Sequence, residues 1–207
     1  GLKFEIAAFD PSLSASARYL EDGTLSIPET YNTCIVLAYE MDYEGYKTAP
    51  AGPAGAATGN GYSRMAFTAS CLAEFIRNLG YGAVPCGNNT ALSVPLAIDA
   101  GIGEKSRMGC IVTPKYGPRV RLNKVFTNLP LDHDAPISFG VEEFCTVCKK
   151  CVDSCPSSAL RDEEQSFTSD NISSIQGVKK WQHDMEKCLK FWMENGNDCA
   201  ICFTVCP

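Results

Sequence analysis

Four cysteines lie in the stretch EEFCTVCKKCVDSCPSSAL, at positions 145, 148, 151 and 155, and Pro156 follows the last of them. The spacing CxxCxxCxxxCP is typical of bacterial 4Fe-4S ligand sets, in which three thiolates hold one cluster and the fourth crosses to a second cluster. Two intervening residues let a tight loop direct successive sulfur atoms into one cavity. The pattern therefore predicts electron-transfer chemistry, and a tetrahedral zinc site is the less favoured alternative.

A second cysteine run, CAICFTVCP, places Cys199, Cys202 and Cys206 before Pro207 and lacks only a first ligand, which Cys188 can supply from upstream. The crossover rule divides the eight cysteines into two sets, Cys145, Cys148, Cys151 and Cys206 in the first, and Cys155, Cys188, Cys199 and Cys202 in the second. No cysteine of either run is left over, so the sequence predicts two 4Fe-4S clusters that act as an electron relay.

The other cysteines and the two histidines give weaker signals. Disulfides are disfavoured, because disulfide scaffolds are short chains with dispersed half-cystines and not runs two residues apart. The remaining cysteines stand singly in apolar surroundings and are predicted to be small buried core residues, namely Cys34, Cys71, Cys86 and Cys110. His133 and His183 are predicted to lie at the surface.

Composition limits the class of protein. With 207 residues, of which 45% are hydrophobic, the chain is long enough to bury a core. A net charge of -6 disfavours a nucleic-acid partner, because binding to phosphates relies on clustered Lys and Arg. The chain has no uninterrupted apolar run long enough for a membrane span. We expect a globular protein whose attachment to a membrane, if any, depends on a partner.

The elements that position the cysteines come before them in the chain. The stretch TCIVLAYEM, residues 33–41, predicts a buried strand, and residues 62–83 have apolar residues at helical spacing, with Gly80 as the stop signal. A shorter helix interrupted by Pro95 should follow, and then two strands joined around PKYGPR. This alternation predicts an α/β unit over residues 1–139, separated by the turn-rich linker LPLDHDAPISFG from a cysteine-rich unit over residues 140–207.

The glycine-rich stretch APAGPAGAATGNGYS, residues 49–63, allows two interpretations. A flexible surface loop is favoured over a phosphate cradle, because neither GxxxxGK[ST] nor a strand-linked GxGxxG is present. Its position before a helix would also suit a backbone that closely approaches a large, planar ligand with polar edges. Composition alone leaves both interpretations open.

Several blocks of the sequence together resemble one protein family over nearly the whole chain. These blocks are TGNGYSRM, LSVPLAIDAGIGE, TPKYGPRVR, KVFTNLPL, FCTVCKKCVDSCPS and CLKFWMENGNDCAICFTVCP. In their order they resemble the corrinoid- and iron-sulfur-dependent reductive dehalogenases, of the tetrachloroethene type, that serve organohalide respiration. The resemblance implies an α/β (α+β) cobalamin-binding domain, similar to corrinoid-processing and nitroreductase-like folds, followed by a ferredoxin-like domain with two 4Fe-4S clusters.

The resemblance also implies roles for individual residues. Tyr62 looks like the proton donor to the substrate carbon, and Arg121 like the arginine whose positive charge eases proton loss from this tyrosine. Asn88 looks like the amide that holds the tyrosine hydroxyl, while Thr58 and Trp192 look like walls of the substrate pocket. The implied contacts to cobalamin are Thr58, Asn60, Gly61, Asn88, Ser93, Pro95, Ala97, Gly101, Met108, Thr113 and Tyr116.

Each of these residues also has a simpler interpretation. A tyrosine near a helix start is usually a packing residue with a solvated hydroxyl. Arg121 could be an exposed strand charge, with Arg119 in its place if the register differs by two. Trp192 could shield a cluster. The sequence DHD at 132–134 does not match the DxHxxG pattern by which some corrinoid enzymes supply a histidine to cobalt, which agrees with a base-off cobalamin.

The function implied by the resemblance is that of an oxidoreductase. Cobalamin in its Co(I) state would cleave a carbon-halogen bond in a small organohalide, with electrons from the two clusters and a proton from Tyr62. The family further implies a membrane anchor protein, a respiratory electron donor, a possible homodimer, and a peripheral location on the exoplasmic face of the cytoplasmic membrane. No nucleic acid is expected as a partner.

Two alternatives remain at this point. Epoxyqueuosine reductase also combines cobalamin with a double-cluster unit, but it uses a carboxylate where Tyr62 stands and needs a basic surface for tRNA. A non-catalytic electron carrier of the ferredoxin type would bind iron without cobalt.

Overall fold

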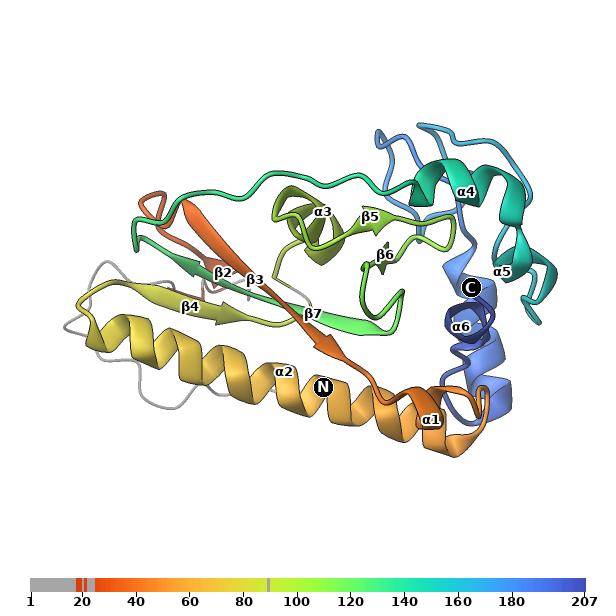
Figure 1. The fold of residues 1–207 in the computed structure, drawn as a ribbon, viewed down its shortest axis with the longest axis horizontal. Helices are drawn as coiled ribbons and strands as arrows, with labels where there is room; N and C mark the ends of the chain where they lie inside the picture. The colour runs from red at the N-terminus through yellow and green to blue at the C-terminus, as the bar shows by residue number, and fades with distance from the viewer. Residues whose placement is uncertain (1–17, 20, 22–24, 89) are drawn as a thin grey trace.

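The computed structural model describes residues 18–19, 21, 25–88 and 90–207, so the first part of the predicted 1–139 unit lies outside the described residues. The elements follow in the order β1 (Arg18–Tyr19), β2 (Leu25–Ser26), β3 (Thr33–Glu40), α1 (Tyr43–Tyr46), α2 (Gly52–Asn78), β4 (Ala83–Cys86), α3 (Ser93–Asp99), β5 (Glu104–Lys105), β6 (Ile111–Val112), β7 (Val120–Thr127), α4 (Val141–Cys148), α5 (Lys150–Asp153), α6 (Met185–Asn195) and α7 (Ile201–Thr204). Figure 1 shows α2 running along the sheet, with the cysteine-bearing helices gathered at one end of the molecule.

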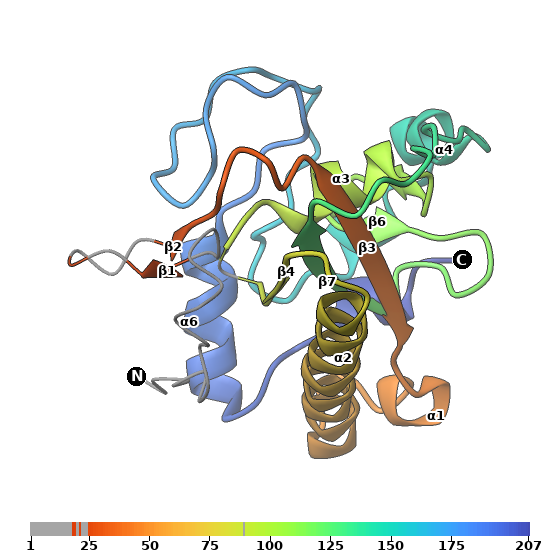
Figure 2. The same ribbon diagram turned by 90° about the vertical axis from the view of Figure 1, so that its left-hand side faces the viewer.

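The main sheet has three antiparallel strands in the order β3-β7-β4. The central strand β7 is buried along most of its length, because α2 covers one face of the sheet and α3 packs on the other (Figure 2). The strand predicted over 33–41 is confirmed. The two strands predicted around PKYGPR exist, but they do not pair with each other: β6 pairs with β5, and β7 takes the centre of the main sheet.

Helix α2 is longer than the sequence predicted, because it begins at Gly52 and includes the glycine-rich stretch. The surface-loop prediction for residues 49–63 is therefore wrong. Pro53 stands in the first turn of the helix, where a backbone N–H has no acceptor within the helix, so the missing N–H of proline costs no hydrogen bond. The helix ends at Asn78, and Gly80 follows with a φ of 92°, as the stop signal predicts.

The buried face of α2 is mostly made of small residues. Small side chains let the helix approach the sheet closely, which offsets the low helix propensity of glycine. Of the apolar residues expected to face the core, Met65 and Ile76 do so, whereas Phe67 and Phe75 are exposed. The buried residues of the helix are Ala54, Ala57, Thr58, Gly61, Met65, Ala69, Ala73 and Ile76.

Helix α3 is confirmed, but Pro95 does not interrupt it. Pro95 is the third residue of the helix, within the first turn, where its missing N–H leaves no intrahelical bond unmade. Residues 129–140 have no regular structure and run back along the molecule from the end of β7 to α4 (Figure 1). This course agrees with the linker predicted from its turn-forming residues.

Four side chains differ from their predicted burial. Cys86 is buried, but Cys71 is exposed because it lies on the outer side of α2, and Cys34 and Cys110 are only partly buried. His183 was predicted to lie at the surface and is instead 7% exposed, because its ring packs against the backbone of residues 107–109. No helix in the described part of the chain combines the length and the hydropathy that a bilayer crossing requires.

Candidate functional site

Tyr62, Asn88 and Arg121 meet at one side of the sheet, although they come from α2, the segment after β4, and β7. Asn88 Nδ2 donates a hydrogen bond to the Tyr62 hydroxyl at 2.9 Å, and Arg121 Nη1 lies 3.4 Å from the same oxygen. The Arg121 guanidinium also stacks over the Tyr62 ring, 4.7 Å from its centroid. The structure thus brings together the three side chains to which the sequence assigned a catalytic role.

The alternation of β7 explains why Arg121 points at α2. Residues 121, 123 and 125 share the face that α2 covers, and Asn123 Nδ2 donates to the carbonyl of Met65 on that helix at 2.7 Å. Gly61 leaves space for this approach: a Cβ there would lie 3.1 Å from Arg121 Cγ and 3.1 Å from Met41 Cγ. Gly61 is therefore needed for close packing beside Tyr62.

Arg119, the alternative to Arg121, lies elsewhere. Its guanidinium contacts Glu40 at 3.4 Å, donates to the Met41 carbonyl at 2.9 Å and stacks over the ring of Tyr43. The geometry therefore places Arg121, and not Arg119, at the Tyr62 hydroxyl.

Thr58 lies one turn before Tyr62 and faces a second tyrosine. The hydroxyls of Thr58 and Tyr46 are 2.8 Å apart, and Tyr46 also donates to Met41 Sδ at 2.9 Å. Burial raises the pKa of Tyr46, although the hydrogen bond with Thr58 and the nearby Arg121 act in the opposite direction. Tyr46 was missed by sequence reasoning, because nothing in the stretch DYEGYK distinguishes it from Tyr43.

Lys124 was also missed, although it supports the segment that carries Asn88. Its side chain is fully buried, and the ammonium donates to the carbonyls of Gly87 and Ala91 and to Ser93 Oγ, at 2.7, 2.8 and 2.9 Å. Burial lowers the pKa of Lys124. The only sequence signal was a charged residue at a position of β7 that faces the core.

The residues predicted to contact cobalamin are spread over several elements. Asn60, Asn88 and Pro95 are exposed, and Ser93 and Gly101 are half-buried, whereas Ala97 is fully buried in the core between α3 and the sheet. The exposed Asn88 amide beside Tyr62 has the donors and the acceptor that suit a planar ligand with amide-bearing edges. The donor chemistry around Tyr62 thus fits a corrinoid, while the Ala97 side chain has a packing role.

Three further predicted contacts lie near the cysteine-rich end. Met108 and Thr113 line a cavity of about 440 Å³ together with cysteines of the first set. Tyr116 lines a neighbouring cavity of about 270 Å³, which also includes Arg119 and Cys206. Met108, Thr113 and Tyr116 of the α/β unit therefore line cavities that also include cysteines of the first set.

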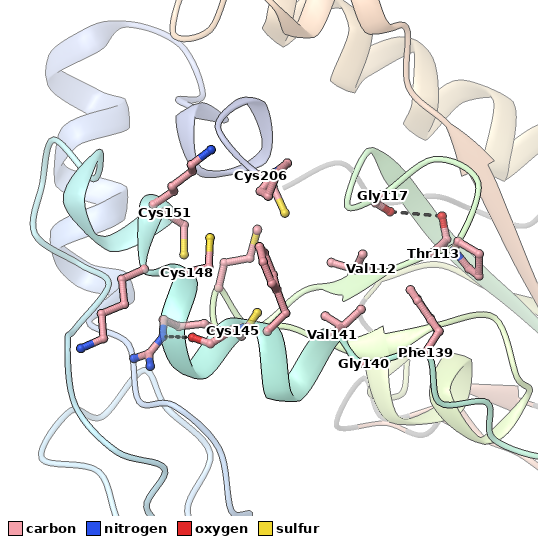
Figure 3. Close-up of a pocket in the computed structure, with 17 residues that line it drawn as sticks. Val112, Thr113, Gly117, Phe139, Gly140, Val141, Cys145, Cys148, Cys151 and Cys206 are labelled. Atoms are coloured by element: carbon pink, nitrogen blue, oxygen red, sulfur yellow. Dashed lines mark hydrogen bonds between the residues drawn. The ribbon is translucent and has the colours of Figure 1, made fainter.

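The four cysteines of the first set converge on the 440 Å³ cavity, and Figure 3 shows their side chains around it. Cys145 and Cys148 come from α4, Cys151 from α5, and Cys206 from the segment after α7. Burial, together with the neighbouring thiols of Cys145, Cys151 and Cys148, raises the pKa of Cys206 to about 11. The crossover that brings Cys206 to the first run is thus present in the fold.

The second set gathers in the same way. Burial raises the pKa of Cys188, and the neighbouring thiols of Cys155 and Cys199 add to the increase. Burial also raises the pKa of Cys202, and the thiols of Cys110, Cys199 and Cys188 add to the increase. Burial alone would raise the pKa of Cys155. Hydrogen bonds from Ser157 and from nearby backbone groups outweigh burial, so the pKa of Cys155 is lowered.

Both sets fit iron-sulfur clusters by donor chemistry, since each offers four thiols. The first set takes three cysteines from one run and Cys206 from the other, whereas the second combines Cys199 and Cys202 with Cys155 and Cys188. Among the described residues, no three Cys, His, Asp or Glu side chains are close enough together to enclose one metal ion.

Trp192 lies on α6 and is 41% exposed. It follows Cys188 by one helical turn, so the two side chains share a face of the helix. This position agrees with the alternative in which Trp192 shields a cluster, and its role as a wall of the substrate pocket stays a prediction.

Comparison with known proteins gives three findings. A family described as a 4Fe-4S double cluster binding domain matches residues 144–207. The tetrachloroethene reductive dehalogenase of Sulfurospirillum multivorans is 46% identical over 186 residues, which are 90% of this chain and 37% of that protein. A solved reductive dehalogenase, described with a mechanism for B12-dependent dehalogenation, is 29% identical with a TM-score of 0.74 over 84% of this chain and 25% of that one.

Epoxyqueuosine reductase, the alternative family, is a more distant match. The Bacillus subtilis enzyme is 37% identical over 111 residues, which cover 52% of this chain and 26% of that protein. The match to the dehalogenases is longer and closer. The chain spans about a third of the length of these curated dehalogenases, and it belongs to the reductive dehalogenase family.

Proposed function

We propose that this chain is the catalytic core of a reductive dehalogenase that replaces the halogen of a small organohalide by hydrogen. The overall reaction consumes two electrons and one proton and releases a halide ion. The observation that carries the proposal is the Tyr62 hydroxyl held by Asn88 and Arg121, in a chain that also gathers two sets of four cysteines.

We propose one 4Fe-4S cluster on each cysteine set and a base-off cobalamin beside Tyr62, in a unit of corrinoid-processing or nitroreductase-like type over residues 1–139. When bound, the corrinoid supplies carbon-halogen cleavage and the clusters supply electron relay. The residues that would hold the corrinoid include the exposed amides Asn60 and Asn88. The cysteine-rich unit over 140–207 would receive electrons from a respiratory donor.

In this proposal the chain itself controls one proton. Tyr62 Oη gives its proton to the substrate carbon, which takes up the electron pair as halide leaves. Arg121 stabilises the negative charge that develops on Tyr62 Oη, because a nearby positive charge favours the ionised form. Asn88 orients the same oxygen through its 2.9 Å hydrogen bond. Thr58 and Trp192 are proposed to line the pocket.

The partners and the location stay proposals carried over from the family. They are a small membrane anchor protein, a homodimer, and a peripheral position on the exoplasmic face of the cytoplasmic membrane. Co-expression with a candidate anchor, followed by membrane flotation, would test the attachment. Recovery of the chain in the soluble fraction in every case would contradict it.

The first experiment is the iron and cobalt content of the chain purified without oxygen and reconstituted with cobalamin. We expect about eight irons and about one cobalt per chain. Halide release from chlorinated ethenes, measured with a reduced artificial donor, then tests the reaction. Iron without cobalt would support the electron-carrier alternative, and reduction of epoxyqueuosine in tRNA without halide release would support the alternative family.

A further inference from the structure

Arg107 lies between the α/β unit and the first cysteine set, in the turn between β5 and β6. Its side chain is only 3% exposed. Its backbone N–H points at Cys145 Sγ, with 3.4 Å between nitrogen and sulfur, and its Nε donates to the Cys145 carbonyl at 3.0 Å. Arg107 also lines the cavity on which this cysteine set converges.

The rest of the guanidinium is held by neutral groups. Its Nη1 donates to the carbonyls of Arg161 and Glu163 at 3.3 and 3.1 Å, and its Cζ lies 4.8 Å from the centroid of the Trp181 ring. His183 fixes the same turn, because its Nε2 lies 2.6 Å from the Arg107 carbonyl oxygen. Five residues thus hold the arginine in one position.

The positive charge of Arg107 has no carboxylate partner within the described part of the chain, where its acceptors are backbone carbonyls. A buried charge without a counterion is costly, and proteins usually pair it. The cavity beside Arg107 offers the missing partner, since four thiolates and a 4Fe-4S cluster together carry a net negative charge. That charge becomes more negative by one unit when the cluster is reduced.

We propose that Arg107 is a positioning residue that sets the reduction potential of the cluster held by Cys145, Cys148, Cys151 and Cys206. Its buried positive charge stabilises the reduced cluster more than the oxidised one, and its N–H bond to Cys145 Sγ acts in the same direction. Arg107 therefore makes this cluster easier to reduce than it would be without the buried charge. This inference rests on the proposed function, because it requires the cluster.

The test is a redox titration followed by electron paramagnetic resonance, on the anaerobically reconstituted chain and on Arg107→Gln. Removing the charge should lower the reduction equilibrium constant of one cluster roughly tenfold, which for one electron is about 59 mV. The other cluster should change much less. Arg107→Lys keeps the charge and loses the planar fork, so its potential should stay near that of the unmodified chain.

Arg161→Gln is the matched control, because it removes a guanidinium from the same region that is already paired with Asp170 at 2.8 Å. Its effect on either potential should be small. Unchanged potentials in Arg107→Gln, with iron content equal to that of the unmodified chain, would overturn this inference but leave the proposed function standing. If Arg107→Gln loses its iron, Arg107→Lys decides, since a large potential shift in that variant would also overturn a role based on charge. Absence of iron from the unmodified chain would instead refute the proposed function.

Discussion

The smallest scale is the Tyr62 hydroxyl, which receives hydrogen bonds from two donors and keeps its own proton available. We predict that Tyr62→Phe lowers halide release at least about 100-fold, the usual contribution of a positioned general acid. Iron and cobalt contents should not change, because the removed oxygen binds neither metal. Steady-state halide release and metal analysis of the same preparation check this prediction.

Tyr43→Phe is the control for this substitution, because Tyr43 is 51% exposed on α1 and contacts Lys47 and Arg119 but not the Tyr62 group. It should release halide at the unmodified rate. Unchanged turnover in Tyr62→Phe would refute the proton-donor role, whatever the metal content.

Gly61 gives a second prediction at this scale. An added methyl group in Gly61→Ala would lie 3.1 Å from both Arg121 Cγ and Met41 Cγ, so these side chains must shift, and we expect the shift to disturb the guanidinium at Tyr62. Alanine is the better helix former by about 1 kcal/mol, which offsets part of the strain. We expect halide release to fall several-fold or more, while the free energy of unfolding changes by less than about 1 kcal/mol. Halide assays and urea unfolding measure the two effects.

Gly59→Ala separates the effect of helix propensity from the effect of lost space beside Arg121. Gly59 is exposed in the same helix, and no atom lies within 4 Å of an added Cβ. This variant should gain about 0.5–1 kcal/mol of stability with unchanged activity. Equal loss of activity in both variants would mean that flexibility of α2, and not the space beside Arg121, matters for turnover.

At the scale of elements, sequence periodicity predicted the strand β3, the end of α2 and the cysteine loops, because each depends on local residue types. The start of α2 could not be predicted in this way. Its glycines disfavour an isolated helix, and only the packing of small residues such as Ala57 and Gly61 against distant parts of the chain makes residues 52–61 helical. The prediction that the two strands around PKYGPR pair with each other was wrong for a related reason. The partners of β7 depend on burial of both of its faces.

Strand β7 carries the prediction for Lys124, whose ammonium uses all three of its protons on Gly87, Ala91 and Ser93. Lys124→Met would leave these buried acceptors without a donor, so we expect the free energy of unfolding to fall by about 2–4 kcal/mol. The segment that presents Asn88 should also loosen, and halide release should fall in the variant that remains folded. Urea unfolding and hydrogen exchange of residues 87–93 report the two effects.

Lys47→Met is the matched control, because Lys47 is exposed and contacts its close neighbours in the chain, the Glu44 carboxylate at i,i+3 and the ring of Tyr43. Its effect on stability should be small, because solvent screens an exposed ion pair. If Lys124→Met retained the protection of residues 87–93, the supporting role of Lys124 would be wrong even if stability fell.

At the scale of the whole molecule, the α/β unit and the cysteine-rich unit are joined by polar contacts that no local pattern reveals. The Glu104 carboxylate accepts from the backbone N–H groups of Phe139 and Val141, at 3.0 and 2.8 Å, and so holds the start of α4. Arg107 and His183 hold the other side of the same region. The spacing of the cysteines predicted the two cysteine sets, but it gave no sign of these supports, because their partners lie far away in the chain.

His183 makes this junction sensitive to acid. Burial lowers its pKa, and the positive charges of Lys180, Arg161 and Arg107 lower it further, against the hydrogen bond to the Arg107 carbonyl. The folded chain therefore keeps His183 neutral at a pH where the unfolded chain, with a histidine pKa near 6.5, already binds a proton. Linkage then requires the free energy of unfolding to decrease as the pH falls below about 6.5.

The prediction is that His183→Gln, which keeps a donor for the Arg107 carbonyl but cannot titrate, loses stability less steeply between about pH 6.5 and 5.5 than the unmodified chain. His133→Gln removes the other histidine, which is exposed, and should leave the slope unchanged. Anaerobic urea unfolding at several pH values measures all three slopes. Parallel curves for His183→Gln and the unmodified chain would mean that carboxylates, and not this buried imidazole, cause the acid sensitivity, and that the contact between residues 107 and 183 tolerates a charged histidine.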